Sequence, residues 1–521
     1  MDGKKQRHHP QKRFSITIVL SLLFFPSTVA LAKEENTIYD LAIVNATVVS
    51  PERQSPLKNA TILIRDGLIV DIVHDNHVFK AEATIDGEGG FLIPGLIDSH
   101  VHLYHATGLK QRYTDQFETL YAAYMTQMPR SFLYHGFTTV IETNADREAN
   151  QQFTKSAQHP DLKHCGAGLI LSDGYMASEL PKGKLMTYAP NFLHDRFNNG
   201  YLPEAAVAAE HTSKATVAKI AESGAVCIKL FYEEALWMPG GAPNLALPSE
   251  EIIREVVSEA RSLGLSVVMH ATSPKGHKFA RNTGVDIIAH GPWDWKGNDY
   301  SNSEIPSQIQ QTIVATGLDK IAVQPTISAL QHTASLFKPE FLADSALEKV
   351  LPAAFIDYLR TDAQIQIGIF IDIFGAAITT DPTPEKIAPA MSTMIGRYKR
   401  MTGLMAKSGT NLLLGSDTSS GGFGWGNPPG LNGFWEMKDW AESGVALDVI
   451  FAASTINNAR AFGLENEIGT VEIGKRANLL LLKTNPLQEI EAYNKIQTVI
   501  LRGNPIGRDT LSAENLPSPA I

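Results

Sequence analysis

Two histidines close an apolar run near residue 100, in the segment FLIPGLIDSHVH at 91–102. Side chains alternate between the two faces of a strand, so His100 and His102, two positions apart, would point the same way. A pair of imidazoles at a strand end can hold one metal ion. By itself the pair equally suits two polar residues that close a strand, so other residues must distinguish the two interpretations.

Four further polar residues stand in or at the end of other apolar runs: Lys229 in AVCIKLF, His270 in SVVMH, His290 in DIIAHG and Asp417 in LLLGSD. Singly, each has an ordinary explanation, as a core histidine, half of a buried ion pair or a helix cap. A lysine inside an apolar strand is costly as a cation, and more so beside metal ions. Six such residues at the ends of five runs favour a metal centre.

These runs belong to a set of eight that alternate with longer, helix-like stretches. The eight predicted strands are Leu92–Ile97, Thr138–Glu142, Gly166–Leu171, Val226–Phe231, Ser266–His270, Asp286–His290, Ile321–Thr326 and Leu412–Asp417. Apolar strands alternating with helices predict a parallel sheet, and eight units predict an α/β protein with a (β/α)8 barrel, a TIM barrel. Such barrels place their active sites at the carboxyl ends of the strands.

The two ends of the chain carry short strand patterns. One set lies at 40–73 with a turn at Asp66-Gly67, and the other at 468–486 and 496–506. Neither set suffices for a domain, so we expect one small composite β-sandwich built from both. The predicted division is a signal peptide at 1–32, the first part of the sandwich at 33–93, the barrel at 94–467 and the second part of the sandwich at 468–521.

The segments FLIPGLIDSHVH, VMHA, GVDIIAHG, LLLGSDT and IGTVEIGKRANLLLL resemble those of the amidohydrolase superfamily. Within it, the chain resembles the imidazolonepropionase-related enzymes and the Xaa-Pro dipeptidase (prolidase)-like enzymes. The resemblance implies two divalent metal ions, with zinc as the expected metal. His100, His102 and Asp417 would hold the more buried ion, and His270 and His290 the more exposed one. Lys229, carboxylated by carbon dioxide to a carbamate, would bridge them.

The same resemblance implies hydrolysis of an amide or peptide bond, in a dipeptide or an N-acyl amino acid. A bridging hydroxide would attack, Asp417 would shuttle the proton, and Tyr232 would bind the oxyanion or a substrate carboxylate. Lactones and phosphotriesters are alternative substrates for such a site. A mononuclear deaminase or imidazolonepropionase-like enzyme is less favoured because Ala271-Thr272-Ser273 follow His270, where that class has a glutamate. A metal-binding scaffold is a further alternative.

Two features depart from these relatives. Glu142 ends the second predicted strand, where relatives tend to have an Arg-Asp pair, and the stretch SSGGFGWGNPPG at 419–430 is long and glycine-rich. Its aromatic residues, Phe423 and Trp425, suggest an apolar lip over the substrate. The stretch at 327–389 is longer than one helix requires and suggests an insertion over the barrel mouth.

The amino terminus predicts export. A basic segment precedes the apolar run FSITIVLSLLFF at 14–25, and Ala30-Leu31-Ala32 offers a cleavage site. The expected location is therefore periplasmic or extracellular, without stable membrane insertion after signal removal.

The net charge of -10 disfavours nucleic acid as a partner. The expected partner is a small-molecule substrate, and the sequence leaves open whether the protein forms a homo-oligomer. Cys165 and Cys227 lie in apolar runs, which predicts two buried free thiols.

Overall fold

The computed structural model describes residues 38–516, except 75–77, 110–116, 145–146, 179, 237–244 and 420–424. The predicted signal peptide and its cleavage site lie outside the described residues, as does Phe423. Strands from both ends of the chain form one mixed sheet, ordered β16-β15-β14-β5-β1-β2-β3, in which β4 also pairs with β1. These strands are β1 Ile38–Val48, β2 Leu57–Arg65, β3 Leu68–His74, β4 Lys80–Asp86, β5 Phe91–Pro94, β14 Leu479–Leu482, β15 Ile496–Leu501 and β16 Asn504–Gly507.

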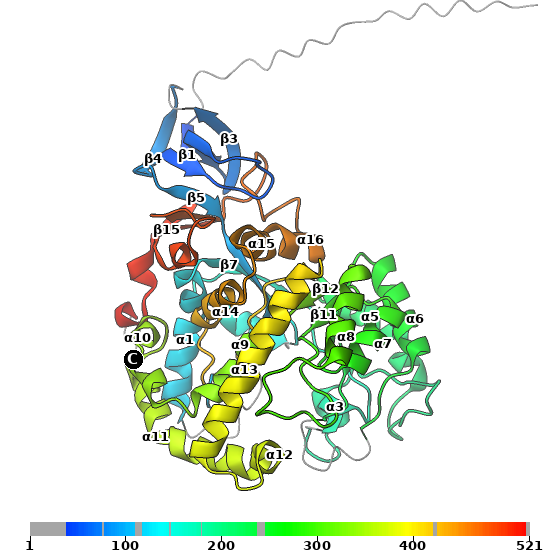
Figure 1. The fold of residues 1–521 in the computed structure, drawn as a ribbon. Helices are drawn as coiled ribbons and strands as arrows, with labels where there is room; N and C mark the ends of the chain where they lie inside the picture. The colour runs from blue at the N-terminus through cyan, green and yellow to red at the C-terminus, as the bar shows by residue number, and fades with distance from the viewer. Residues whose placement is uncertain are drawn as a thin grey trace, which may run out of the picture.

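The mixed sheet forks at β1, because the first half of this strand pairs with β4 and its last residues pair with β5. Apolar side chains from both ends of the chain meet in one buried cluster, which includes Ile43, Ile62, Leu92 and Leu479. The predicted turn at Asp66-Gly67 joins β2 to β3, with a positive φ at both residues, as such a tight hairpin requires. Figure 1 shows the blue strands of the amino-terminal end beside the red strand β15.

Eight parallel strands form two further sheets, ordered β6-β7-β8 and β13-β12-β11-β10-β9. They are β6 Leu96–Val101, β7 Phe137–Glu142, β8 Asp161–His164, β9 Cys227–Tyr232, β10 Ser266–Ala271, β11 Ile287–Ala289, β12 Ala322–Gln324 and β13 Asn411–Leu412. A parallel bridge between Val101 and Thr418 joins the outer edges of β6 and β13. At the other pair of edges, the Val226 amide donates to the His164 carbonyl at 2.9 Å.

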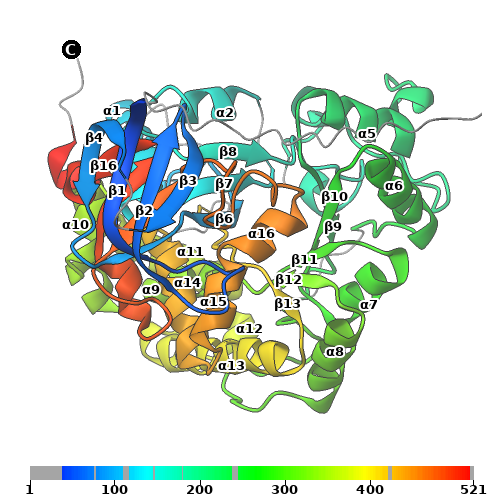
Figure 2. The same ribbon diagram turned by 90° about the horizontal axis from the view of Figure 1, so that it is seen from above.

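One apolar cluster receives side chains from all eight of these strands or from the residue that directly follows them. Its members include Ile97, Ile141, Val268, Ala322 and Leu413, together with residues of α16. In Figure 2, the green helices α5 to α8 lie outside the strands β9 to β12. The parallel strands thus have one apolar side facing this cluster and the other facing helices, as parallel sheets require.

The main helices that accompany the parallel strands are α1 Glu118–Tyr134, α2 Arg147–Phe153, α5 Ser213–Glu222, α6 Glu250–Ser262, α7 Pro274–Thr283, α8 Ser307–Leu318, α13 Pro384–Lys407, α14 Leu431–Glu442, α15 Leu447–Ala453 and α16 Ile456–Ala461. The predicted helix at 250–264 corresponds to α6, whose first turn is capped by the Ser249 hydroxyl. Gly264, with φ +72°, follows its end. Shorter helices are α3 Tyr175–Ser178 and α4 Leu185–Tyr188.

The stretch expected to be an insertion contains four helices and the beginning of α13. They are α9 Ile327–Ser335, α10 Ala346–Val350, α11 Ala353–Phe370 and α12 Ala376–Ile378. The continuous helical stretch Ala353–Ile378 is, among the described residues, the one stretch long and apolar enough to cross a membrane by length and composition. A single helix of this kind is weak evidence for a membrane span, because core helices of water-soluble proteins meet the same criteria.

Two predicted strands are misplaced. Phe91–Pro94 joins the mixed sheet, and the first parallel strand begins only at Leu96, after Gly95. The third strand is Asp161–His164 and not Gly166–Leu171, because Gly166 takes a φ of +66° that ends the extended run. The sequence DLKH has little apolar character, which is why the pattern of apolar runs missed it.

The prediction of two free thiols is wrong, because Cys165 and Cys227 form a disulfide with a Cα–Cα distance of 4.3 Å. Cys165 directly follows β8 and Cys227 begins β9, so the adjacent edges of these strands bring the two residues together. Both side chains are fully buried in the cluster shared by the eight strands. Apolar surroundings suit a buried thiol and a buried disulfide equally, so the apolar runs around the two cysteines could not distinguish these states.

We expect the denatured, unreduced protein to have no reactive thiol, and the reduced protein to have two. Replacing both cysteines with serine should lower the unfolding midpoint, with a loss of about 2–4 kcal/mol, because the cross-link restricts the unfolded chain. Thiol titration in denaturant and thermal unfolding followed by circular dichroism measure both effects. Two thiols without reduction would contradict the cross-link.

Candidate metal centre

The structure brings the six predicted ligand residues together at the carboxyl ends of the parallel strands. Ligand atoms of His100, His102 and Asp417 all lie within 4.8 Å of one another. Asp417 Oδ1 is 3.1 Å from His102 Nε2 and 3.5 Å from His100 Nε2. Lys229 Nζ lies 3.3 Å from His100 Nε2. The ring centres of His100 and His290 are 5.3 Å apart, and those of His270 and His290 are 4.6 Å apart.

Backbone and side-chain bonds between β6 and the segment after β13 set the positions of the first three residues. The Asp417 amide donates to the His100 carbonyl at 2.8 Å, and the His102 amide donates to the Thr418 carbonyl at 2.5 Å. Below them, Asp98 accepts from the Ser416 amide at 2.9 Å and from its hydroxyl at 2.6 Å. Burial raises the pKa of Asp98 to about 7, although the bonds from Ser416 oppose this shift.

Three residues at this edge have backbone conformations that side chains rarely adopt. His290, Thr326 and Asp417 have φ values of +80°, +50° and +53°. His290 directly follows β11, whereas Thr326 and Asp417 lie in the segments that follow β12 and β13. Such strain persists only where the surroundings hold it in place, and it concentrates at functional sites.

His100 has a defined second partner on its Nδ1. The Gln324 amide nitrogen donates to the carbonyl and the hydroxyl of Ser99, at 2.8 Å each. Gln324 Oε1 is therefore the atom that faces His100 Nδ1, at 3.2 Å, and it must accept the proton of that nitrogen. His100 Nε2 is left with its lone pair directed toward Lys229 and Asp417.

The other three imidazoles also face acceptors. The Thr326 hydroxyl donates to the Pro325 carbonyl, so it accepts from His290 Nδ1 at 2.7 Å. Glu233 Oε2 lies 2.7 Å from His270 Nε2, and Glu142 Oε1 lies 3.4 Å from His102 Nδ1. A carboxylate can only accept from these ring nitrogens. One nitrogen of His100, His270 and His290 is thus held by an acceptor, and the other keeps a lone pair, as in metal-binding histidines. His102 differs, because a carboxylate oxygen faces each of its nitrogens, Glu142 at Nδ1 and Asp417 at Nε2.

Burial and charge shift the basicity of these groups. Burial lowers the pKa of Lys229 to about 8, against the attraction of Asp417 and Glu142. Burial, together with the Lys229 charge, brings the pKa of His100 well below its ordinary value. Burial also opposes the charge on His102, but hydrogen bonding with Asp417 and Glu142 prevails and raises the pKa of that ring to about 9. In their unprotonated forms, imidazoles, a carboxylate and an amine are a donor set that fits zinc or a similar divalent ion.

Tyr232 does not lie with the other predicted site residues. Lys229 and Tyr232 point to opposite faces of β9, because three positions separate them. The Tyr232 ring packs on Phe279 of α7, with ring centres 4.7 Å apart, and its hydroxyl hydrogen-bonds to Lys275. The structure therefore does not bring Tyr232 to the candidate ligands, and its catalytic role stays a prediction.

Four residues that hold the ring nitrogens were not predicted as parts of the site: Glu142, Glu233, Gln324 and Thr326. Glu142 was identified only as a departure from relatives. Glu233 follows Lys229 by four residues. Gln324 ends β12 and Thr326 lies two residues further on, at the same edge as the histidines. Their position at the carboxyl ends of strands was the available signal.

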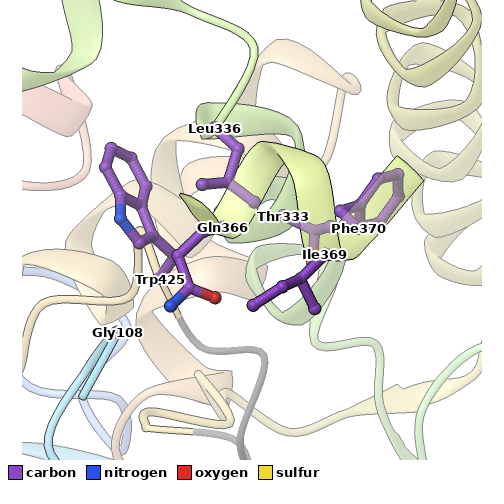
Figure 3. Close-up of a pocket in the computed structure, with 7 residues that line it drawn as sticks. All are labelled: Gly108, Thr333, Leu336, Gln366, Ile369, Phe370 and Trp425. Carbon is purple, nitrogen blue, oxygen red and sulfur yellow. The ribbon is translucent and has the colours of Figure 1, made fainter. Parts of the chain in front are cut away.

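A pocket lies between the predicted insertion and the loops that follow the candidate ligands. Figure 3 shows Trp425 on one side and Gln366, Ile369 and Phe370 of α11 on the other. Thr333 and Leu336, from the end of α9, and Gly108 complete it. Gly108 follows His102 by six residues, and Trp425 follows Asp417 by eight. The loop with Trp425 is tied to the site because Asn427 Nδ2 donates to the Asp417 carbonyl at 3.0 Å.

A family model described as the amidohydrolase family matches residues 91–295 and 392–506, which include all six candidate ligands. The chain belongs to the amidohydrolase family. The unmatched residues 296–391 contain Gln324, Thr326 and most of the pocket lining. The predicted family resemblance is therefore confirmed.

Curated relatives match in part. An L-hydantoinase of Paenarthrobacter aurescens is 34% identical over 104 residues, which are 20% of each chain. An imidazolonepropionase of Aromatoleum aromaticum is 28% identical over 240 residues, 43% of this chain and 56% of that protein. The chain spans about half or less of the length of the curated relatives it matches.

Solved structures match over more of the chain. A Xaa-Pro dipeptidase with bound methionine has a TM-score of 0.56 at 20% identity, covering 90% of this chain and 99% of that one. The ochratoxinase of A. niger has a TM-score of 0.60 at 18% identity, covering 93% of this chain and all of that one. At such low identity these likenesses establish the fold alone.

We expect His102→Ala to lower the content of divalent metal in the purified protein, because it removes one of the three residues whose ligand atoms converge, His100, His102 and Asp417. Metal analysis by mass spectrometry after dialysis measures the content. His194→Ala is the matched control, since this half-buried ring bonds to the Gly200 carbonyl and lies outside the six-residue cluster. Equal metal content in both variants would contradict the assignment of His102.

Proposed function

We propose that this protein is a metal-dependent hydrolase of carbon–nitrogen bonds that cleaves an amide or peptide bond in a small substrate, such as a dipeptide or an N-acyl amino acid. The observation that carries the proposal is the set of four imidazoles beside Asp417 and Lys229. Three of them have one nitrogen held by an acceptor and the other free to bind a metal, and the fourth, His102, faces Glu142 and Asp417. Membership of the amidohydrolase family and the partial match to an L-hydantoinase support it.

The proposal includes two metal positions in a closed (β/α)8 barrel. His100, His102 and Asp417 would hold one ion, and His270 and His290 the other, with zinc as the expected metal. Closure is supported by the bridge from Val101 to Thr418 and by the apolar cluster common to all eight strands. Two divalent ions bound there would lower the pKa of a shared water molecule and polarise the substrate carbonyl.

Lys229 is proposed to join the two positions as a carbamate. Its side chain is 2% exposed and lies among the candidate ligands, where an ammonium would repel metal ions. The neutral amine would attack carbon dioxide, forming a nitrogen–carbon bond and releasing one proton. The product is an anion with two oxygens, which provides one donor for each position.

Asp417 is proposed to act on the proton of the reaction. Its Oδ1 faces both His100 and His102, and its backbone is fixed by the His100 carbonyl and by Asn427. Asp417 would accept the proton of the attacking water and donate it to the amine that leaves. A carboxylate in this fixed position needs little movement between the two transfers.

The pocket at Trp425 is proposed to contact an apolar part of the substrate. Leu336, Phe370 and Trp425 supply apolar walls near the loops that follow His102 and Asp417.

Export of the protein is also proposed. The predicted signal peptide supports it, and so does the buried disulfide, since disulfides persist in oxidising compartments.

We expect the purified protein to contain close to two divalent metal ions per chain and to hydrolyse N-acyl amino acids or dipeptides. A screen of metal-loaded protein against these compounds, lactones and phosphotriesters tests the bond type. A protein that cleaves only lactones or phosphotriesters would refute the proposed amide hydrolysis, and a single ion per chain would refute the two-metal site.

Lys229→Ala should lose most bound metal and at least about 100-fold in turnover, because it removes the proposed bridge. Short carboxylic acids should restore part of both losses, since a free carboxylate can occupy the vacated space. Unchanged metal content in Lys229→Ala would exclude the bridging role.

Asp417→Asn should remain folded and lose turnover. Wild-type turnover in this variant would exclude the proton transfer.

A further inference from the structure

Two buried carboxylates lie beside the candidate ligands without belonging to them. Glu142 ends β7 and is fully buried, and Glu233 directly follows β9 with 3% of its surface exposed. A buried carboxylate is costly unless hydrogen bonds and a nearby positive charge compensate it. The contacts of each one show what it can do.

Glu233 is held by three donors. The Ala235 amide donates to Oε1 at 2.5 Å, and the Thr272 hydroxyl donates to Oε2 at 3.0 Å. The third donor is His270 Nε2, 2.7 Å from Oε2. Because both oxygens are occupied, Glu233 cannot turn toward a metal without breaking bonds to the backbone and to Thr272. Its accessible role is to accept the His270 proton.

Glu142 is held in a similar way. The Leu103 amide donates to Oε2, and the Asn144 amide donates to Oε1 at 2.9 Å. The same Oε1 lies 3.4 Å from His102 Nδ1, a longer approach than that of Glu233 to His270. Two backbone amides thus orient this carboxylate toward the ring from neighbouring strand ends.

The remaining two imidazoles have neutral partners, Gln324 for His100 and Thr326 for His290. Each proposed metal position therefore contains one histidine backed by a carboxylate and one backed by a neutral group. A carboxylate that accepts a ring proton makes the opposite nitrogen a stronger donor, and loss of such a partner typically lowers metal affinity about 10- to 100-fold.

We propose that Glu142 and Glu233 are positioning residues, one for each metal position, which fix the ring orientation of His102 and His270 and strengthen their free nitrogens as metal donors. This inference rests on the proposed two-metal function. Since the Glu233 contact is the shorter one, its loss has the larger effect, and it acts on the position of His270 and His290.

The test measures metal retention by the purified, metal-loaded full chain during dialysis against graded concentrations of a chelator. Glu233→Gln should release one ion at an affinity about 10- to 100-fold lower than in the wild type, while the second ion is retained. Glu142→Gln should weaken the other ion by a smaller factor. Cobalt substitution adds a spectroscopic measurement, since the absorption bands of one of two cobalt ions should shift in Glu233→Gln.

Asp195→Asn is the matched control. Asp195 is also a buried carboxylate, but it accepts from the amides of Phe197 and Ser249 and from the Ser249 hydroxyl. It should retain both ions with wild-type affinity. Thr272→Val provides a second variant, because it keeps the Glu233 charge and removes one bond to it, and its metal loss should be smaller than that of Glu233→Gln.

The outcomes separate the two proposals. If the wild type itself binds fewer than two ions, the two-metal function fails. If the wild type binds two ions and folded Glu233→Gln and Glu142→Gln hold both with unchanged affinity and cobalt spectrum, only the positioning roles are overturned. Equal metal loss in Asp195→Asn would also overturn them, because any buried carboxylate would then have the same effect.

Discussion

The removal of ionisable groups from water at one edge of the parallel strands is the constraint on which the rest of the structure depends. Four imidazoles, one amine and three carboxylates lie there, all with little exposure to solvent. Isolated charges in such surroundings are strongly unfavourable, so each group needs a partner of defined geometry. The strand ends, the tight turns after them and the network around Asp98 and Ser416 all serve to provide those partners.

The partners come from strands other than those of the rings they hold. His100 is held from the seventh strand by Gln324, and His270 is held from the loop after β9 by Glu233. The positive φ values at His290, Thr326 and Asp417 belong to the same arrangement, because each turns the chain at the point where a side chain must face the cluster. The strain is therefore local, and the surrounding hydrogen bonds hold it.

Much of the candidate site followed from the sequence because apolar runs end where polar residues begin. His100, His270 and Asp417 could be placed on this rule without knowledge of the strand order. The rule gave the wrong third strand, since DLKH at 161–164 has no apolar run. It also did not show that Tyr232 lies on the face of β9 that packs against α7.

The residues that face the ring nitrogens could not be predicted from the sequence, for a different physical reason. Glutamate, glutamine and threonine at a strand end are common as solvated residues, and only the packing of neighbouring strands makes Glu233 or Thr326 a partner of a ring. The disulfide is similar, because two cysteines 62 positions apart meet only where the edge strands β8 and β9 of the two parallel sheets lie next to each other. Contacts that depend on strand order require the structure.

The segment 296–391, which lies outside the family match, has two roles that are usually separate. It supplies Gln324 and Thr326, which hold two of the histidines, and also Leu336, Gln366 and Phe370 of the pocket wall. Because α9 begins one residue after Thr326, a histidine partner and part of the pocket wall lie on one short stretch of chain. Exchange of this segment between relatives would therefore alter the pocket wall and the histidine partners together.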